Sequence, residues 1–272
     1  MDHAHVSALA DRLIDAYAGV HTLDLLTASD PTLDVAAAYE VLGEIHARRA
    51  ASGWQPAGRK IGFSNRTIWT RYGVDRSIWA HIYSQTVHRA PEGHATLAVS
   101  GFVQPRIEPE IVFGLRGPVP VAGDARAVLD AVGWMGAGFE IVQCHFPGWK
   151  FQAPDAIAAF GLHGALVIGP VRQLDGRERD RLAAALPEFE LTLHRGVEIV
   201  DRGRGSQVLD SPALALQHLA SVLGSQPGAP SLAAGEIVTT GTLTDAWPIE
   251  PGTRWRSDYG ALGVSGIELE IE

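Results

Sequence analysis

Two glutamates interrupt a run of the sequence that otherwise has the apolar character of a buried strand. The run is QPRIEPEIVFGL, residues 104–115, and Pro109 separates Glu108 from Glu110. Side chains two positions apart in a strand point to the same face, so both carboxylates project together, roughly 7 Å apart along the backbone. Two interpretations follow. Either the glutamates form the wet face of an edge strand, which Pro109 also suits, or a divalent cation lies between them in a pocket.

A third glutamate is embedded in a second apolar run. Glu140 lies within GFEIV, residues 138–142, and a carboxylate is costly to bury unless it is paired or binds a metal. Carboxylate oxygens are the ligands that Mg²⁺ and Mn²⁺ prefer. Three of them would leave about three positions of an octahedral ion open. The metal interpretation therefore predicts an open, catalytic site on Glu108, Glu110 and Glu140.

The composition argues against several classes of protein. The formal net charge of −9 over 272 residues disfavours nucleic-acid binding. No apolar run approaches the ~20 residues of a membrane span, and the first residues, MDHAHVSALADRLIDAY, lack the basic start of a signal peptide. The single cysteine, Cys144, precludes an internal disulfide and a Cys-based zinc cluster. We therefore expect a cytoplasmic protein that acts on a small molecule, without a nucleic-acid or membrane partner.

Lysine is rare in this chain. Only Lys60 and Lys150 among the 22 basic residues are lysines. The surroundings of a lysine can shift its pKa far more readily than that of an arginine, which suits lysine to catalysis. Beside three carboxylates and a dianionic substrate, Lys60 would balance charge and hold an enolate oxygen or a carboxylate. The alternative is an ordinary surface lysine.

The hydrophobic periodicity predicts an α+β protein. Apolar residues at three-to-four spacing predict helices at 3–18 and 34–52, the second capped by Asp34 or Thr32. Further helices are expected at 124–135 and from Ser211–Pro212 to about Leu223. Strands are expected at 60–63, 103–115, 138–143, 164–168, 235–244 and 266–272, with a hairpin at 188–200 that turns at Arg195–Gly196.

Two other polar residues are catalytic candidates, each with a structural alternative. His163 would act as a general acid or base near neutral pH, or it is a hydrogen-bonded core histidine. Asp155 would take part in catalysis, or it caps a short helix. The aromatic loop His145–Lys150 would close over the site as a lid, or it packs down on the protein. Three residues between the Lys60 and Glu108 segments would meet a substrate carboxylate or stay on the surface: Arg66, Arg71 and His81.

The motifs taken together resemble a known family. In order along the chain they are Lys60-Ile61-Gly62, Gly73-Val74-Asp75, QPRIEPE at 104–110, Phe139-Glu140-Ile141-Val142 and Thr240-Gly241-Thr242-Leu243-Thr244. From about Ala8 to the C-terminus the chain is similar to the 2-keto-4-pentenoate hydratase / 4-oxalocrotonate decarboxylase family, within the fumarylacetoacetate hydrolase superfamily. The resemblance implies a mixed β-roll core of the fumarylacetoacetase C-terminal type. It also implies a helical region, residues 1–55, packed on a catalytic roll, residues 56–272.

The resemblance implies a chemistry as well. It places Mg²⁺ or Mn²⁺ on Glu108, Glu110 and Glu140, puts Lys60 in the active site and predicts a homo-oligomer. The substrates would be 2-oxo acids and their dienol forms, such as 2-hydroxypenta-2,4-dienoate. We expect a hydro-lyase, a hydratase of the 2-keto-4-pentenoate type. The alternatives are a 2-oxo acid decarboxylase or an acylpyruvate-type C–C hydrolase on the same metal site, or a binding homologue without turnover.

The chain departs from the family pattern around the expected proton-transfer residues. Many members carry an acidic residue where this chain has Ile78, and Asp, Asn and Ser where it has Ala159, Phe160 and His163. The expected metal ligands thus match the family, whereas the expected proton-transfer residues are replaced. If the protein retains hydratase activity, we expect His163 to act as the general acid or base.

Aromatic residues near these motifs predict an unusual substrate. Trp79, Trp149 and Phe160 are expected to make the pocket more aromatic than a five-carbon acid requires. We therefore expect a bulkier or more apolar 2-oxo acid.

Overall fold

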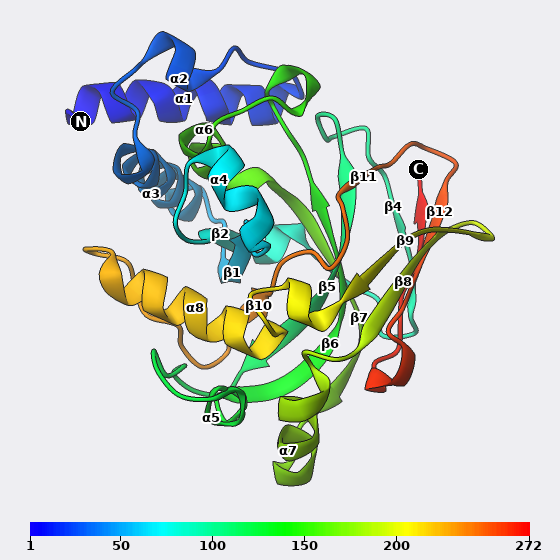
Figure 1. Cartoon of the computed structure of the whole chain (residues 1–272). Helices are drawn as coiled ribbons and strands as arrows, with labels where there is room; N and C mark the ends of the chain where they lie inside the picture. The colour runs from blue at the N-terminus through cyan, green and yellow to red at the C-terminus, as the bar shows by residue number, and fades with distance from the viewer.

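A sheet of eight strands forms the centre of the computed structural model, which describes residues 1–272 (Figure 1). Seven strands follow the order β2-β1-β10-β5-β6-β7-β3, and the short β11 pairs with β5. Their bounds are β1 Pro56–Gly62, β2 Ile78–Tyr83, β3 Val87–Arg89, β5 Arg106–Leu115, β6 Val132–Val142, β7 His163–Gln173, β10 Ile237–Thr239 and β11 Trp247–Pro248.

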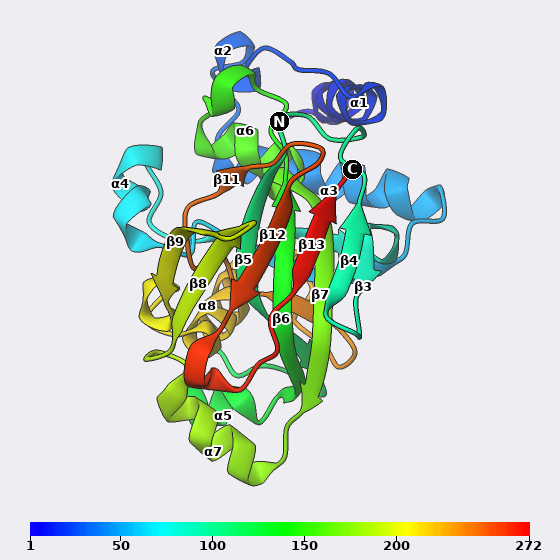
Figure 2. The ribbon, with the colours of Figure 1, turned by 90° about the vertical axis from the view of Figure 1, so that its right-hand side faces the viewer.

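A second, five-stranded sheet packs over one face of the first (Figure 2). Its order is β4-β13-β12-β8-β9, and β8 and β9 form the hairpin expected at 188–200. Phe139 of the first sheet and Leu193 and Trp255 of the second belong to one buried apolar cluster between the sheets. The bounds are β4 His94–Leu97, β8 Glu190–Arg195, β9 Glu198–Arg204, β12 Arg254–Asp258 and β13 Glu268–Ile271. The α+β prediction is confirmed.

Helices cover one end and one flank of the sheets (Figure 1). α1, α2, α3 and α6 gather at one end, where Leu13, Ile45 and Ile157 share a second buried cluster. Their bounds, with those of the others, are α1 His3–Gly19, α2 Leu26–Ser29, α3 Val35–Ala51, α4 Trp69–Tyr72, α5 Ala125–Leu129, α6 Ala153–Ala158, α7 Gly176–Ala185 and α8 Pro212–Ser225. None of them has both the length and the apolar character needed to cross a membrane.

The longer helices begin where the sequence supplies caps. Asp2, Asp34 and Ser211 precede α1, α3 and α8, and each side chain accepts a backbone N–H from the first turn. Such caps satisfy donors that the helix itself cannot. Asp34 rather than Thr32 caps α3, and Pro212 occupies the first turn of α8 as expected.

Two predicted elements are corrected. The helix expected at 124–135 ends at Leu129, and Val132 already starts β6, because pairing with both β5 and β7 outweighs the weak helical pattern there. The strand expected at 235–244 is limited to Ile237–Thr239, because the chain turns away at Gly241, where φ is 100°.

The edge-strand interpretation of Glu108 and Glu110 is wrong. β5 lies inside the sheet, with β6 on one side and β10 and β11 on the other. Pro109 is tolerated because neither β10 nor β11 pairs with it in a ladder. On that side its carbonyl accepts the N–H of Leu243. Proline has no N–H to donate, and its nitrogen faces the gap between the two short strands, where no ladder hydrogen bond is lost.

Candidate active site

The three candidate carboxylates meet on neighbouring strands. β5 carries Glu108 and Glu110 on one face, and the ladder to β6 sets Glu140 directly opposite Glu108. One oxygen from each carboxylate lies within 4.8 Å of the others. Like charges directly opposite each other in a sheet are destabilising. The arrangement therefore costs stability, as functional sites commonly do.

The hydrogen bonds around these carboxylates leave two fully buried oxygens without a partner. The N–H of Gly241 donates to Glu110 Oε2 (2.7 Å), and His163 Nδ1 donates to Glu140 Oε1 (2.7 Å). Glu110 Oε1 and Glu140 Oε2 are buried and accept no hydrogen bond, although Lys60 Nζ lies 3.4 Å from Glu140 Oε2. Buried polar atoms are normally satisfied, so these two oxygens are the ones best placed to bind a cation.

Gly241 fits its place because it has no side chain. Its φ is 100°, and a Cβ atom there would lie 2.0 Å from Ser64 Oγ. This conformation directs its N–H at Glu110 just after β10 ends. The motif around Gly241 thus supplies a backbone donor that fixes one carboxylate.

Lys60 is buried beside the carboxylates, so the surface-lysine alternative is wrong. It lies on β1 and is 3% exposed, and its Nζ donates to the carbonyl of Gly161 (3.0 Å). That carbonyl belongs to the turn Phe160-Gly161-Leu162, in which all three residues have positive φ. A Cβ on Gly161 would lie 2.8 Å from Ala80 Cβ and 3.3 Å from Lys60 Cδ. The turn therefore approaches Lys60 closely and fixes its ammonium group.

The surroundings shift the pKa values of all four groups. Burial raises the pKa of Glu108 to about 7, Lys60 opposing the rise and Glu140 adding to it. Burial and the charges of Glu140 and Glu108 raise the pKa of Glu110 well above its usual range. Burial would raise the pKa of Glu140, but Lys60 and His163 outweigh it and lower that pKa. Burial would lower the pKa of Lys60, but the three carboxylates outweigh it and raise that pKa. Lys60 is thus an ammonium beside a site that attracts cations or protons.

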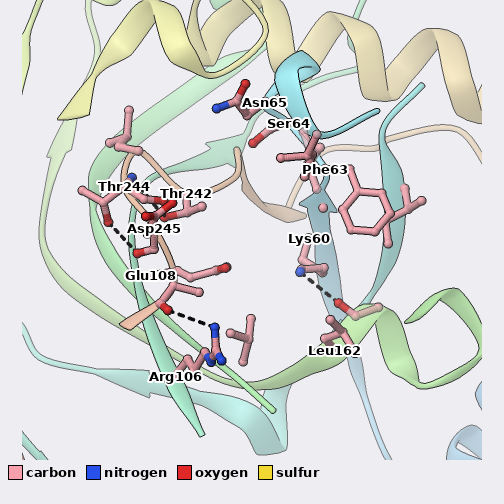
Figure 3. Close-up of a pocket in the computed structure, with 18 of the residues that line it drawn as sticks. Lys60, Phe63, Ser64, Asn65, Arg106, Glu108, Leu162, Thr242, Thr244 and Asp245 are labelled. Carbon is pink, nitrogen blue, oxygen red and sulfur yellow. Dashed lines mark hydrogen bonds between the residues drawn. The ribbon is translucent and has the colours of Figure 1, made fainter. Parts of the chain in front are cut away.

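A cavity of about 440 Å³ opens beside Lys60 and Glu108. Figure 3 shows these two side chains on facing walls, with Thr242, Thr244 and Asp245 beside Glu108. Glu110 and Glu140 are fully buried next to Glu108. The cavity therefore gives a small molecule access to the lysine and to the edge of the carboxylate cluster.

His163 and Asp155 lie outside the cavity lining. His163 is buried between Glu140 and Thr86, whose Oγ1 lies 2.9 Å from His163 Nε2. Asp155 is buried too, where it accepts the N–H of Gln152 (3.0 Å) at the start of α6 and both the N–H and the hydroxyl of Thr27 (3.0 and 2.8 Å). The geometry of both residues fits the structural alternatives, a hydrogen-bonded core histidine and a helix cap.

The other sequence candidates separate into two groups. Arg71 lines the cavity, and so does Trp149, which belongs to the loop His145–Lys150. Trp149 Nε1 donates to the carbonyl of Gln104 (2.9 Å), and Gly148 N–H donates to its Oε1 (2.9 Å), so the loop is packed down. Two residues lie elsewhere: exposed Arg66, which pairs with Asp210, and buried His81, whose ring stacks on that of His46.

The expected aromatic lining is partly wrong. Trp79 stacks on Tyr39 (5.4 Å between ring centroids), and Phe160 packs on Tyr17 (5.0 Å), both away from the cavity. Adjacent residues of a strand face opposite ways, so proximity to a motif in the sequence does not settle which way a ring points. The aromatic residues that line the cavity are Phe63, Tyr72, Trp149 and Phe151.

Arg106 also lines the cavity, although no sequence pattern above singles it out. It is half-buried, its guanidinium lies 4.2 Å from the ring centroid of Trp149, and its one hydrogen bond, to the carbonyl of Ala246, is long (3.4 Å). The spacing contained the signal, because Arg106, Glu108 and Glu110 alternate along one strand and share a face.

Comparison with known proteins places the chain among enzymes. Residues 78–265 match the family model described as fumarylacetoacetate (FAA) hydrolase C-terminal. A 2-hydroxyhexa-2,4-dienoate hydratase of Comamonas testosteroni is 29% identical over 269 residues, which cover 98% of each chain. A 4-oxalocrotonate decarboxylase of Pseudomonas sp. (strain CF600) is 26% identical over 258 residues, which cover 94% of each chain.

A solved structure has the same fold over its whole length. The 4-oxalocrotonate decarboxylase of Pseudomonas putida G7, complexed with magnesium and adipate, superposes with a TM-score of 0.90 at 23% identity, covering 100% of this chain and 99% of that one. The expected roll with N-terminal and flanking helices is thereby confirmed.

Proposed function

The chain belongs to the fumarylacetoacetate (FAA) hydrolase C-terminal family, and on that premise we propose that it is a divalent-metal-dependent hydro-lyase of 2-hydroxydienoates, of the 2-keto-4-pentenoate hydratase type. The observation that carries the proposal is the cluster of Glu108, Glu110 and Glu140 beside the buried ammonium of Lys60. Residues 56–272 would form the catalytic roll, on which the helices of residues 1–55 pack. The substrate is a small 2-oxo acid in its dienol form.

The carboxylate cluster fits a hard divalent cation. Glu108, Glu110 and Glu140 would hold Mg²⁺ or Mn²⁺, because the cluster offers only oxygen ligands. Neighbouring ligands of an octahedral magnesium ion lie roughly 3 Å apart, so oxygens within 4.8 Å of one another need only small side-chain movements. The unpartnered Glu110 Oε1 and Glu140 Oε2 support the same assignment. When bound, the cation supplies a Lewis acid for the carboxylate and 2-oxygen of a 2-oxo acid.

Lys60 supplies the second positive charge. Its Nζ already donates to the carbonyl of Gly161, which suits a hydrogen-bond donor rather than a base or a Schiff-base amine. Gly161 fixes it, and it can donate to the 2-oxygen of the substrate as negative charge develops there during proton transfer. Net hydration then places the hydroxyl of water on C4 and a proton on C5 of the dienol, which ketonises.

His163 and Asp155 act on the site through other residues in this proposal. His163 donates to Glu140 and fixes the orientation of that carboxylate, as outer partners of metal ligands do. Asp155 ties α6 to Thr27, ahead of the turn that carries Gly161. A direct acid–base role for His163 or Asp155 would require a change of position, because neither lines the cavity.

One observation favours a second candidate, decarboxylation. Arg106 lines the cavity without a carboxylate partner, and it could pair with the second carboxylate of a dicarboxylic 2-oxo acid. Relatives of similar identity include both a hydratase and a decarboxylase. C–C bond hydrolysis of an acylpyruvate, or binding without turnover, is compatible with the same cluster.

Product identity separates these activities. 2-Hydroxypenta-2,4-dienoate and 2-hydroxymuconate are followed by ultraviolet absorbance with Mg²⁺ and with EDTA, and the product masses are measured. We expect Mg²⁺-dependent loss of the pentadienoate with the gain of one water. Loss of carbon dioxide from 2-hydroxymuconate alone would establish a decarboxylase. No turnover of either compound, with Mn²⁺ bound, would contradict hydration and favour a binding protein.

We further propose that the protein is a cytoplasmic homo-oligomer. This proposal rests on the family resemblance and on the buried, unpaired Cys144, which suits a reducing compartment. Light scattering coupled to size exclusion measures the mass directly, and a monomer at micromolar concentration would contradict the oligomer.

A further inference from the structure

The cavity beside Lys60 is larger than the smallest dienoate needs. Its volume of about 440 Å³ lies within the range of roughly 300–1,000 Å³ that is typical of sites for drug-sized ligands. Four aromatic residues line it together with the catalytic groups, namely Phe63, Tyr72, Trp149 and Phe151. All four are half-buried. They therefore keep apolar surface that the protein core does not cover.

The four rings form one continuous aromatic wall. Phe63 stacks on Tyr72 (4.7 Å between ring centroids, 17° between planes), and Tyr72 stacks on Phe151 (5.3 Å, 11°). Trp149 closes the series at 6.3 Å from Phe151, tilted by 59°. A stack of near-parallel rings can be extended by one more planar apolar group.

Backbone strain holds two rings of this wall in place. Phe63 and Trp149 have φ values of 56° and 59°, a strained region that bulky residues rarely adopt. Trp69 Nε1 donates to the carbonyl of Phe63 (2.7 Å), and Trp149 Nε1 donates to that of Gln104 (2.9 Å), so both conformations are fixed by tryptophan hydrogen bonds. Strain of this kind at two bulky residues of one cavity indicates a binding role for the wall.

The charges around the wall favour an uncharged ligand group. An apolar aromatic surface offers no hydrogen bond to a carboxylate that has lost its water, so a charged group is costly to bury against it. Two lining cations already lie over rings of the wall, Arg106 over Trp149 at 4.2 Å and Arg71 over Tyr72 at 5.6 Å, where each is stabilised as a cation–π pair. An uncharged planar group on the wall leaves these contacts as they are.

On the basis of the proposed function, which this inference deepens, we propose that the substrate carries an uncharged planar group, aryl or alkenyl, at the end remote from its carboxylate, and that this group lies on the Phe63–Tyr72–Phe151–Trp149 wall. The reaction keeps its balance: water adds its hydroxyl to C4 and a proton to C5, and the planar group on C5 is unchanged. The wall selects the substrate, and Lys60 and the carboxylate cluster carry out the chemistry.

Three dienols test the proposal with Mg²⁺ present: 2-hydroxypenta-2,4-dienoate, its 5-phenyl derivative and 2-hydroxymuconate. We expect kcat/KM for the 5-phenyl compound to exceed that of the parent by about tenfold or more. Phe151→Leu lowers the ratio of these two values about fivefold, which is within the range measured for aromatic contacts. Phe102→Leu makes the same change at a half-buried phenylalanine outside the cavity and leaves the ratio within about twofold.

Equal or faster turnover of the parent would overturn the inference while leaving the hydratase intact. A preference for 2-hydroxymuconate that Arg106→Met abolishes would also overturn it and would assign a distal carboxylate to Arg106. Calorimetric binding of the saturated analogues 2-oxo-5-phenylpentanoate and 2-oxopentanoate does not depend on turnover. We expect the phenyl analogue to bind about tenfold tighter. Tighter binding of the phenyl analogue without turnover of any dienol would support the binding role of the wall and contradict the proposed hydratase activity.

Discussion

Replacing Glu110 by glutamine should stabilise the metal-free protein. Two unit charges 4.8 Å apart repel by about 3.5 kcal/mol at an effective dielectric constant of about 20. Glu110 faces two such neighbours, Glu108 and Glu140, whereas Lys60 and partial protonation offset much of the repulsion. The amide of glutamine keeps an oxygen that accepts the N–H of Gly241. The expected net gain is about 2 kcal/mol in the free energy of unfolding.

Thermal unfolding in EDTA and in excess Mg²⁺ measures this gain. A gain of that size raises Tm by about 4–8 °C for a chain of this length. Mg²⁺ at about 100 times its Kd should stabilise the wild type by about 2.7 kcal/mol, and Glu110→Gln should lose most of that shift. The variant is therefore more stable in EDTA, and in Mg²⁺ the wild type regains most of the difference.

The control removes the same charge elsewhere. Glu250 is exposed and forms no side-chain ion pair, so Glu250→Gln should leave both melting curves unchanged within about 1 °C. A lower Tm of Glu110→Gln in EDTA, or an Mg²⁺ shift equal to that of the wild type, would refute the argument that the cluster is a repulsive cation site.

Three further predictions concern Lys60, His163 and His81. Lys60→Met should lower kcat for dienol turnover about 10²–10³-fold while Mn²⁺ binding, measured by calorimetry, is retained or tightened; loss of binding instead would make Lys60 structural. His163→Gln should weaken Mn²⁺ binding about 10–100-fold, because Glu140 loses its orienting partner; unchanged affinity would reject that role. Burial and Arg59 lower the pKa of His81 to about 2, so below the usual value of about 6.5 the unfolded chain binds one more proton at this site than the folded protein does. The free energy of unfolding should therefore fall by up to about 1.4 kcal/mol per pH unit as pH drops below 6.5. Urea unfolding between pH 7.5 and pH 5 should show a slope shallower by one proton in His81→Gln, and an unchanged slope would mean that His81 is charged in the folded state.

The sequence predicted the elements whose determinants are local. The period-two spacing of Glu108 and Glu110 placed them on one face, and the caps Asp34 and Ser211 began helices where expected. The prediction covers only the second part of β6, because the first part, residues 132–137, owes its strand structure to neighbours on both sides. Long-range pairing of this kind has no signal in a window of ten residues.

The residues of the candidate site also divide into those that the sequence predicts and those that it does not. The three glutamates and Lys60 were identifiable because a charge within an apolar run is conspicuous. The orientations of Trp79 and Phe160, and the enclosure of His163 between Glu140 and Thr86, depend on which element packs against each residue. These contacts join residues far apart in the chain, such as Tyr17 and Phe160, so the sequence alone did not reveal them.

The location of the aromatic wall bears on how this enzyme can diversify. Glu108, Glu110 and Glu140 lie on long paired strands, where inserting one residue would turn every following side chain to the opposite face. Phe63, Trp149 and Phe151 lie in connections that follow β1 and β6, and Tyr72 lies in the short α4, where insertions and replacements are tolerated. Mutations in these connections can therefore change which distal group of the substrate is accepted without disturbing the residues that carry out the reaction. We expect the sequences of close relatives to differ most in these connections.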